Sequence, residues 1–360
     1  MKYKIFLLFC IISGFVGAQK VIPFVDFNNW FRTVTNGQLA YIELQQIQSY
    51  KAGDNLVAYI DIRGNLRVFD GENRVDISNM NLNFEISDNL LAWNIGTTLS
   101  MWDAGKTRVL NYFGGEYIVK DDLVLYKDTR YNSISVYWNG EIYPVQNATG
   151  ELNLVNSAAI GENIFAFADN GDLFKVFYQG STYEIGVWNG KIDFQSGTDI
   201  IAFNDPTTRT FAAFENGTFV DIEMQWVKKY RAGRGFIVYE DINNNLVLYE
   251  NGQKKQLSSF PGAWEVKDDV VLFQNNGFSY VYYNGQTIEA ANYIIDEYAL
   301  KNGTVVFKNM QGGITAVSEG KLYELTNLQN AEYEIYGNSV LVKLFNNSFI
   351  ILQNGKTIRV

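Results

Sequence analysis

The sequence predicts an all-β fold built from tandem antiparallel units, and three observations point to it. Turn-forming dipeptides that end in glycine recur about every 35 residues along the chain. β-Branched and aromatic residues fill the segments between these turns, and helical periodicity is not sustained anywhere. Proline, which would interrupt strands, occurs only 4 times in 360 residues.

Each dipeptide predicts a two-residue hairpin between two strands. A type I′ turn needs positive φ at both central residues, and Asn-Gly or Asp-Gly satisfies this need best. Ten such dipeptides in near-register indicate an internal repeat rather than isolated hairpins. They are Asn36-Gly37, Asp70-Gly71, Ala104-Gly105, Asn139-Gly140, Gln179-Gly180, Asn216-Gly217, Asn251-Gly252, Asn284-Gly285, Glu319-Gly320 and Asn354-Gly355.

Alignment on these glycines predicts four strands in each unit. A short first strand and a polar turn, such as Asp54-Asn55 or Asp268-Asp269, precede a buried second strand that ends in an aromatic residue. A second polar turn leads to the third strand, the glycine hairpin follows, and a fourth strand ends the unit. The third strands are expected at 66–69, 99–102, 134–137, 174–177, 246–249, 279–282 and 349–352. The second-strand aromatic residues are Tyr59, Trp93, Tyr126, Phe167, Phe203, Tyr239, Phe273 and Phe307.

Four-stranded antiparallel units of about 35 residues in tandem are typical of a β-propeller. Over nearly all of the chain, the pattern resembles the broad WD40-type and YVTN-type propeller superfamily. Trp102-Asp103 is the only Trp-Asp at the expected strand end, and a chain without histidine cannot contain the Gly-His element of WD40 repeats. The resemblance therefore implies the architecture and no specific family.

We expect about ten units in a single repeat domain spanning residues 19–360. Residues 21–44 supply a unit without its first strand. One large ring is favoured because the repeat continues without a break. The alternative is two rings of five units that divide near residues 186–193, where Asn189-Gly190 adds a further hairpin signal.

Residues 1–18 are interpreted as a secretory signal peptide. Lys2 and Lys4 form a basic start, a short apolar run follows, and Val16-Gly17-Ala18 is suited to cleavage. An N-terminal membrane anchor is the alternative. Cleavage would remove Cys10, the only cysteine, so the exported protein is expected to be free of disulfides. A bacterial periplasm or cell surface is the expected location.

Composition restricts the available chemistry. With no histidine, imidazole general-base catalysis and histidine-ligated metals are excluded. The formal net charge of −10 argues against nucleic-acid binding, and no second hydrophobic segment predicts membrane insertion of the mature chain. We expect no cofactor.

Carboxylates remain as candidate acids and bases. Six lie in or beside the turn after the second strand: Asp61, Asp128, Asp169, Asp172, Asp205 and Asp241. No pair stands out as a glycosidase requires, and aspartate is a favoured turn residue, so no catalytic residue is assigned. Asp241-Ile242-Asn243-Asn244-Asn245 resembles the opening of a calcium loop, but it lacks the later glycine and glutamate. No metal site is assigned either.

Aromatic residues are the candidate binding residues. Trp138, Tyr178 and Tyr283 occupy a position next to the end of the third strand that is mostly polar in other units. Trp188 and Trp226 lie in less regular segments. Exposed aromatic rings often bind proteins or stack on sugars, whereas packing between blades is the structural alternative.

These observations favour an exported, non-enzymatic β-propeller that binds a protein partner as an interaction scaffold. A propeller that binds or cleaves carbohydrate with carboxylates facing the central channel is the competing hypothesis.

Overall fold

Every strand pairs only with its neighbours in the sequence, so the chain folds as a series of small antiparallel sheets. The computed structural model describes residues 21–146, 159–169, 171–345 and 347–360. The predicted signal peptide lies outside these residues. We number the sheets as blades 1 to 10 in chain order.

Among the described residues, blades 1 and 5 contain three strands and the other eight blades contain four. Blades 1 to 5 comprise β1 (Val21–Val25), β2 (Phe31–Thr35), β3 (Gln38–Glu43); β4 (Ile47–Ala52), β5 (Val57–Asp61), β6 (Leu66–Phe69), β7 (Arg74–Ser78); β8 (Phe84–Ile86), β9 (Leu90–Ile95), β10 (Thr98–Asp103), β11 (Lys106–Asn111); β12 (Gly114–Val119), β13 (Leu123–Asp128), β14 (Ser133–Trp138), β15 (Glu141–Gln146); and β16 (Ile164–Ala168), β17 (Leu173–Tyr178), β18 (Ser181–Val187).

Blades 6 to 10 repeat the four-stranded pattern. They comprise β19 (Gln195–Ser196), β20 (Ile201–Asn204), β21 (Phe211–Glu215), β22 (Thr218–Glu223); β23 (Tyr230–Ala232), β24 (Phe236–Glu240), β25 (Asn245–Glu250), β26 (Gln253–Ser259); β27 (Trp264–Lys267), β28 (Val270–Asn275), β29 (Phe278–Tyr283), β30 (Gln286–Ala291); β31 (Tyr298–Lys301), β32 (Thr304–Lys308), β33 (Ile314–Ser318), β34 (Lys321–Thr326); and β35 (Glu332–Tyr336), β36 (Ser339–Lys343), β37 (Phe349–Gln353), β38 (Lys356–Arg359). The predicted third strands are all confirmed.

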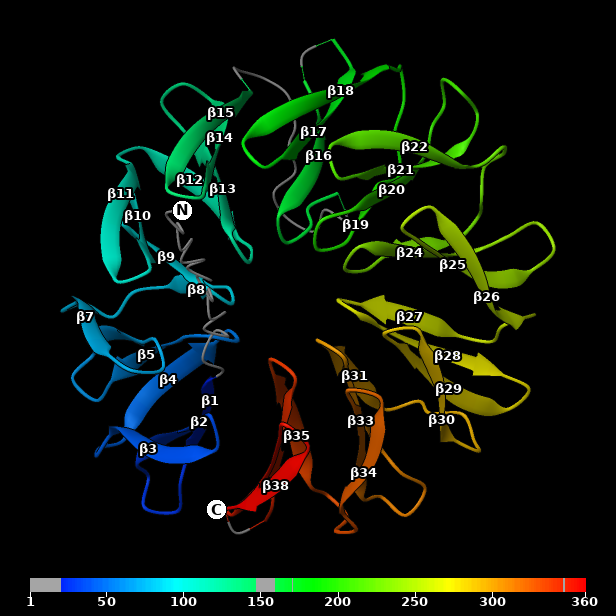
Figure 1. The fold of residues 1–360 in the computed structure, drawn as a ribbon. Helices are drawn as coiled ribbons and strands as arrows, with labels where there is room; N and C mark the ends of the chain where they lie inside the picture. Colours follow the sequence, from blue (N-terminus) through cyan, green and yellow to red (C-terminus); the bar gives the residue numbers. More distant parts are fainter. Residues whose placement is uncertain (1–20, 147–158, 170, 346) are drawn as a thin grey trace, which may run out of the picture.

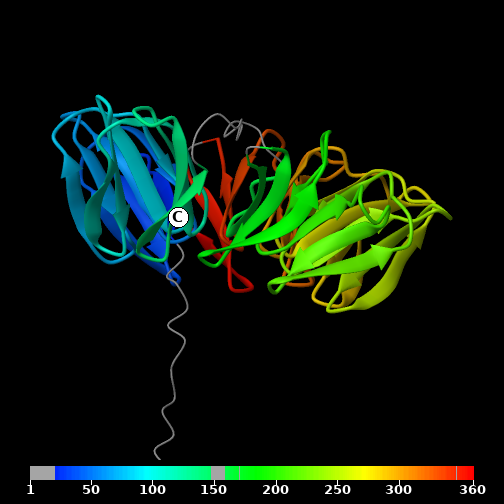
Figure 2. The same ribbon diagram turned by 90° about the horizontal axis from the view of Figure 1, so that it is seen from above.

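The ten blades form one ring, with the first strand of each four-stranded blade nearest the centre and the last strand outside (Figure 1). This confirms the single ring and excludes two rings of five. Viewed from the side, the ring is puckered rather than flat (Figure 2). Blade 1 contains no first strand within residues 21–44, as expected, and in blade 5 only Ile160 bridges to Phe165 at that position.

The up-and-down order of the strands separates the turns onto two faces of the ring. Turns between first and second strands share one face with the glycine hairpins, and we call it the hairpin face. Turns between second and third strands share the other face with the links between blades, and we call it the connector face. Residues far apart in the sequence therefore meet on a common face.

The core consists of separate clusters at the junctions between adjacent blades. At the junction of blades 6 and 7, Phe211 packs against Tyr230 and Tyr239, with ring centroids 5.0 and 5.1 Å apart. The predicted second-strand aromatic residues are buried in such clusters, Tyr59 and Tyr239 completely. The ring is thus stabilised by burial of both blade faces, as repeat architectures require.

Nine of the ten predicted hairpins have positive φ at both central residues, as in a type I′ turn. Asp70-Gly71 is the exception, because φ is positive only at Gly71. There the Asp70 carboxylate accepts hydrogen bonds from the backbone N–H groups of Glu72 and Asn73, at 3.0 and 2.6 Å, and so stabilises a different turn.

Replacing Ala104 by asparagine is expected to stabilise the protein by about 0.5–1 kcal/mol, because Ala104 has a φ of +44° that asparagine adopts more readily. Urea unfolding measures the change. Asn139→Ala, the reverse exchange in the equivalent hairpin, should destabilise the protein by a similar amount. Equal stabilities for Ala104→Asn and the parent would contradict this explanation.

Candidate functional site

Turns between first and second strands approach one another closely around the centre of the ring. The backbone N–H groups of Glu162 and Thr198 donate to the carbonyl oxygens of Gly197 and Gly233 in the next blade, at 3.2 and 3.1 Å. A Cβ added at Gly197 would lie 1.9 Å from the Gly233 oxygen, and one at Gly161 would lie 2.1 Å from the Gly197 oxygen. Glycine at these positions permits the backbone contact.

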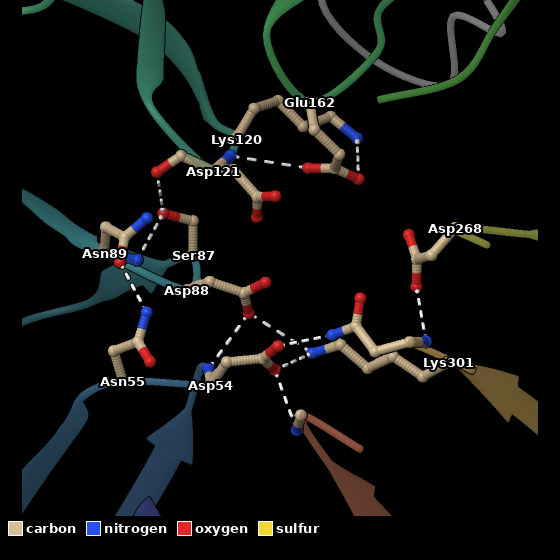
Figure 3. A network of polar contacts seen from close by, with 12 residues as sticks. Asp54, Asn55, Ser87, Asp88, Asn89, Lys120, Asp121, Glu162, Asp268 and Lys301 are labelled. Carbon is tan, nitrogen blue, oxygen red and sulfur yellow. Dashed lines mark hydrogen bonds and ion pairs between the residues drawn. The ribbon is translucent and has the colours of Figure 1, made fainter. Parts of the chain in front are cut away.

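Charged side chains on these turns form a network that crosses the centre of the ring on the hairpin face (Figure 3). Lys301 Nζ of blade 9 lies 2.5 Å from Asp54 Oδ1 of blade 2 and 3.2 Å from Asp88 Oδ1 of blade 3. Lys267 Nζ of blade 8 lies 3.5 Å from Glu162 Oε1 of blade 5. We call this network the inner-rim cluster; its members are Asp54, Asp88, Lys120, Asp121, Glu162, Lys267, Asp268, Lys301 and Asn302.

Asp54 connects the two ends of the ring within this cluster. Its carboxylate accepts hydrogen bonds from the Gly337 backbone N–H, at 2.9 Å, and from the Asn302 side-chain amide. Its backbone carbonyl accepts from the Val21 N–H at 2.9 Å. One residue of blade 2 therefore contacts blades 1, 9 and 10. These contacts lie at the point of the ring where blade 1 has no turn between a first and a second strand within its described residues.

Asp121 is the most perturbed acid of the inner-rim cluster. Burial, followed by the charges of Asp88 and Glu162, raises the pKa of Asp121 to about 9. Figure 3 shows the side chains of Asp88, Asp121 and Glu162 directed toward a shared space. At neutral pH Asp121 is therefore protonated and can donate a proton or a hydrogen bond.

Burial also raises the pKa of Asp54, and Asp88 adds to the effect, although Lys301 opposes it. For Lys301, burial lowers the pKa, but the nearby Asp54 and Asp88 outweigh burial and raise it overall. Lys301 thus remains charged and compensates the acids that it contacts. Among the described residues, no group of His, Cys, Asp or Glu is arranged to hold a metal ion.

Most carboxylates proposed from the turn after the second strand lie on the connector face and stabilise their own turns. Asp61 Oδ1 accepts from the N–H groups of Arg63 and Asn65, at 2.8 and 2.9 Å. Asp205 and Asp241 make equivalent hydrogen bonds. Burial opposes ionisation of Asp61 and Asp241, but these hydrogen bonds outweigh it, so the pKa of each carboxyl is lowered.

The calcium-like segment at Asp241 forms such a turn, with the Asn245 side-chain amide donating to Asp241 Oδ2 at 2.9 Å. The turn interpretation therefore describes this segment. In blade 5, Asp169 forms an ion pair with Lys175 at 2.5 Å. Asn170, between Asp169 and Asp172, lies outside the described residues.

Trp138, Tyr178 and Tyr283 pack toward the following blade. Trp138 contacts the cluster of blades 4 and 5. Tyr178 meets Phe214 of blade 6, with centroids 5.8 Å apart. An added Cβ at Gly303 of blade 9 would lie 2.5 Å from the Tyr283 ring. These three rings are partly buried at blade junctions, and a binding role for them stays a prediction.

The polar residues at this same strand position in other blades also contact the following blade. Asp103 accepts a hydrogen bond from the Tyr137 hydroxyl of the next blade at 2.5 Å, and Glu215 accepts one from the Tyr249 hydroxyl at 2.8 Å. Burial, together with Asp103, raises the pKa of Tyr137 to about 12. The position next to the end of the third strand, which alignment of the repeats identifies, is therefore a contact surface between successive blades.

Trp188 and Trp226 lie together in an open groove between blades 5 and 6 on the connector face. The groove has a volume of about 630 Å³, and its lining also includes Val187, Pro206, Thr207 and Arg209. The tryptophans are 38% and 52% exposed, and Val187 is 67% exposed. The structure thus brings together two tryptophans that the sequence separates by a whole unit.

Backbone contacts hold both tryptophans in place. The Trp188 N–H donates to the Asp172 carbonyl at 3.0 Å, and the Trp226 indole N–H donates to the Asp205 carbonyl at 2.9 Å. Asn204 makes two hydrogen bonds to the backbone of Val227, at 2.9 and 3.0 Å. Such anchoring reduces the entropy lost when the groove binds a ligand.

The inner-rim cluster and the pairing of Trp188 with Trp226 were missed in the sequence. The polar turns were visible there, but nothing indicated which ones meet across the ring. Gly161, Gly197 and Gly233 recur 36 residues apart, and this spacing was a usable signal for close contact between blades.

Ten antiparallel blades around one centre define a β-propeller. Residues 15–358 match the family model described as the 10-bladed beta propeller domain. The chain belongs to this family. No curated protein matches it.

Two solved structures give weak overall superpositions. The computationally designed Ika8 protein has 16% sequence identity and a TM-score of 0.36, with 74% of this chain and 94% of that chain covered. Hsv2p of Kluyveromyces lactis has 8% identity and a TM-score of 0.32, with 68% and 98% covered. The fold assignment depends on the family match and the strand order. No helix among the described residues is long and apolar enough to cross a membrane.

Proposed function

We propose that this protein is an exported, non-enzymatic scaffold of the bacterial envelope or cell surface, and that it binds a protein partner through the groove of Trp188 and Trp226. The single observation that carries the proposal is this pair of exposed tryptophans from neighbouring blades on one cavity. Tryptophan is strongly enriched at the energetic centres of protein interfaces.

The polar groups of the groove favour an apolar protein segment over a sugar. A sugar site needs free hydrogen-bonding groups beside its aromatic rings, but the Trp226 indole N–H is already bonded to Asp205. The Asp205 carboxylate is likewise bonded to the backbone of its own turn. Thr207, Arg209 and the indole N–H of Trp188 are the remaining polar groups in the lining, beside the apolar surfaces of Val187, Pro206 and the two indole rings.

The competing function is carbohydrate binding or cleavage at the inner rim. One feature favours it, namely that burial and the nearby Asp88 and Glu162 raise the pKa of Asp121 to about 9, as a general acid requires. Against it, Asp54 and Asp88 are paired with Lys301. The inner-rim cluster also contains no aromatic residue on which a sugar ring could stack.

Trp188→Ala combined with Trp226→Ala is expected to abolish capture of the partner, with at least a tenfold loss of affinity for the purified complex. Tagged mature protein is used to capture partners from its native envelope, and binding is then measured by calorimetry. Tyr131→Ala is the matched control, because Tyr131 is a 63% exposed aromatic residue on the same face of blade 4.

Partner binding that survives the double substitution would refute the groove as the binding site. Binding or hydrolysis of a polysaccharide that Asp121→Asn abolishes would instead establish the competing function. Mass spectrometry of the exported protein tests the predicted cleavage, which would leave Gln19 as the first residue.

A further inference from the structure

A second cavity lies at the seam where blade 10 meets blades 1 and 2. Its volume is about 360 Å³, which is at the lower end of the range for small-molecule sites. Phe24, Leu341 and Phe349 are buried and contribute apolar surface, and Phe24 and Phe349 lie with centroids 4.7 Å apart. This seam cavity is separate from both the tryptophan groove and the inner-rim cluster.

The seam cavity exists because blade 1 has no first strand between β4 and β35 within residues 21–44. Tyr50 of β4 and Tyr336 of β35 lie near each other across the seam between blades 2 and 10. Glu332, Glu334 and Tyr336 alternate along β35 and therefore project to the same side of the strand, toward Tyr50. The tyrosine pair thus closes part of the seam, and Glu332 and Glu334 line the open remainder.

Among the described residues, only one of the two carboxylates that line the seam cavity is paired with a cation. Glu332 lies 3.5 Å from Lys343, the only cation in the lining. Glu334 accepts a hydrogen bond from the Tyr336 hydroxyl, and it has no ion pair within the described part of the chain. An uncompensated carboxylate on the same side as Tyr50 is therefore left in the seam cavity.

We propose that the seam cavity binds a protonated amine carried on an apolar stem or ring. Glu334 pairs with the ammonium group, the ring of Tyr50 attracts the same charge, and Phe24, Leu341 and Phe349 receive the apolar part. The amine belongs either to a free small molecule or to a lysine side chain of a bound polypeptide, since both present the same chemistry.

Calorimetry with phenethylamine tests the chemistry, with 2-phenylethanol as an uncharged probe of similar shape. Phenethylamine should bind at least tenfold more tightly than the alcohol. Glu334→Gln should weaken phenethylamine binding at least tenfold, whereas Lys343→Gln should strengthen it, because the competing cation is removed. Glu324→Gln, at an exposed glutamate in β34, should change nothing.

A second arm compares a short apolar peptide that contains one lysine with the same peptide acetylated on that lysine. Preference for the unmodified peptide over phenethylamine identifies a polypeptide as the source, and the reverse identifies a free amine. Equal binding of phenethylamine and 2-phenylethanol, or no binding of either amine probe, would overturn the proposal. So would unchanged binding by a Glu334→Gln variant whose thermal unfolding matches the parent.

Discussion

Gly197→Ala is expected to destabilise the ring by about 3 kcal/mol, because the added methyl group would overlap the backbone of the next blade. The added Cβ would lie 1.9 Å from the carbonyl oxygen of Gly233 and 2.8 Å from its carbon. Both atoms belong to the backbone of the next blade, so no side-chain rotation can relieve the contact. The turn must move instead, which breaks the hydrogen bond from Thr198 to Gly233.

Urea unfolding of the variant and the parent measures this loss. Gly252→Ala is the matched control, because Gly252 has a φ of +74° but no neighbouring atom within 4 Å of an added Cβ. Its cost of about 1 kcal/mol comes from backbone conformation alone. If the two alanine variants were equally stable, close contact between blades 6 and 7 would not limit the residue at position 197.

Asp121→Asn is expected to change how stability depends on pH. In the unfolded chain Asp121 loses its proton near pH 4, whereas in the folded protein it retains the proton up to about pH 9. The folded state therefore binds more protons between these values, and rising pH favours unfolding. This carboxyl alone lowers the free energy of unfolding by about 1.4 kcal/mol per pH unit in that window.

Asparagine carries no titrating proton, so the variant should lose this slope. The difference in free energy of unfolding between the variant and the parent should therefore be about 4 kcal/mol larger, in favour of the variant, at pH 8 than at pH 5. Urea unfolding across this range measures both slopes. Glu116→Gln is the control, because Glu116 is an exposed acid in β12 of the same blade and is not among the groups that raise the pKa of Asp121. An unchanged slope in Asp121→Asn would show that the proton resides elsewhere.

Local features were the predictable part of this fold. Asn139-Gly140 sets a hairpin through its own backbone preferences, and Tyr126 marks a buried strand through its neighbours in the sequence. Both signals act within a few residues, so repetition made them reliable. The count of ten units and the shortened first unit followed from the same spacing.

The candidate sites depend on distances that the sequence does not encode locally. Lys301 and Asp54 are separated by 247 positions, and their contact follows from the size and pucker of the ring. Trp188 and Trp226 lie in links between blades, where the repeat alignment has no regular column. The charge on Lys301 could therefore be read from the sequence, but its partners could not.

The first and last blades adjoin without sharing a strand, since each sheet is made from one uninterrupted stretch of chain. The Gly37 backbone N–H donates to the Gln353 side-chain oxygen at 2.6 Å, and the rings of Phe24 and Phe349 pack together, so these contacts join the two blades. A tandem duplication or deletion of about 35 codons would then add or remove one whole blade and leave every remaining sheet intact. Genes of this architecture can change copy number in complete units, and selection need only restore the junctions on either side.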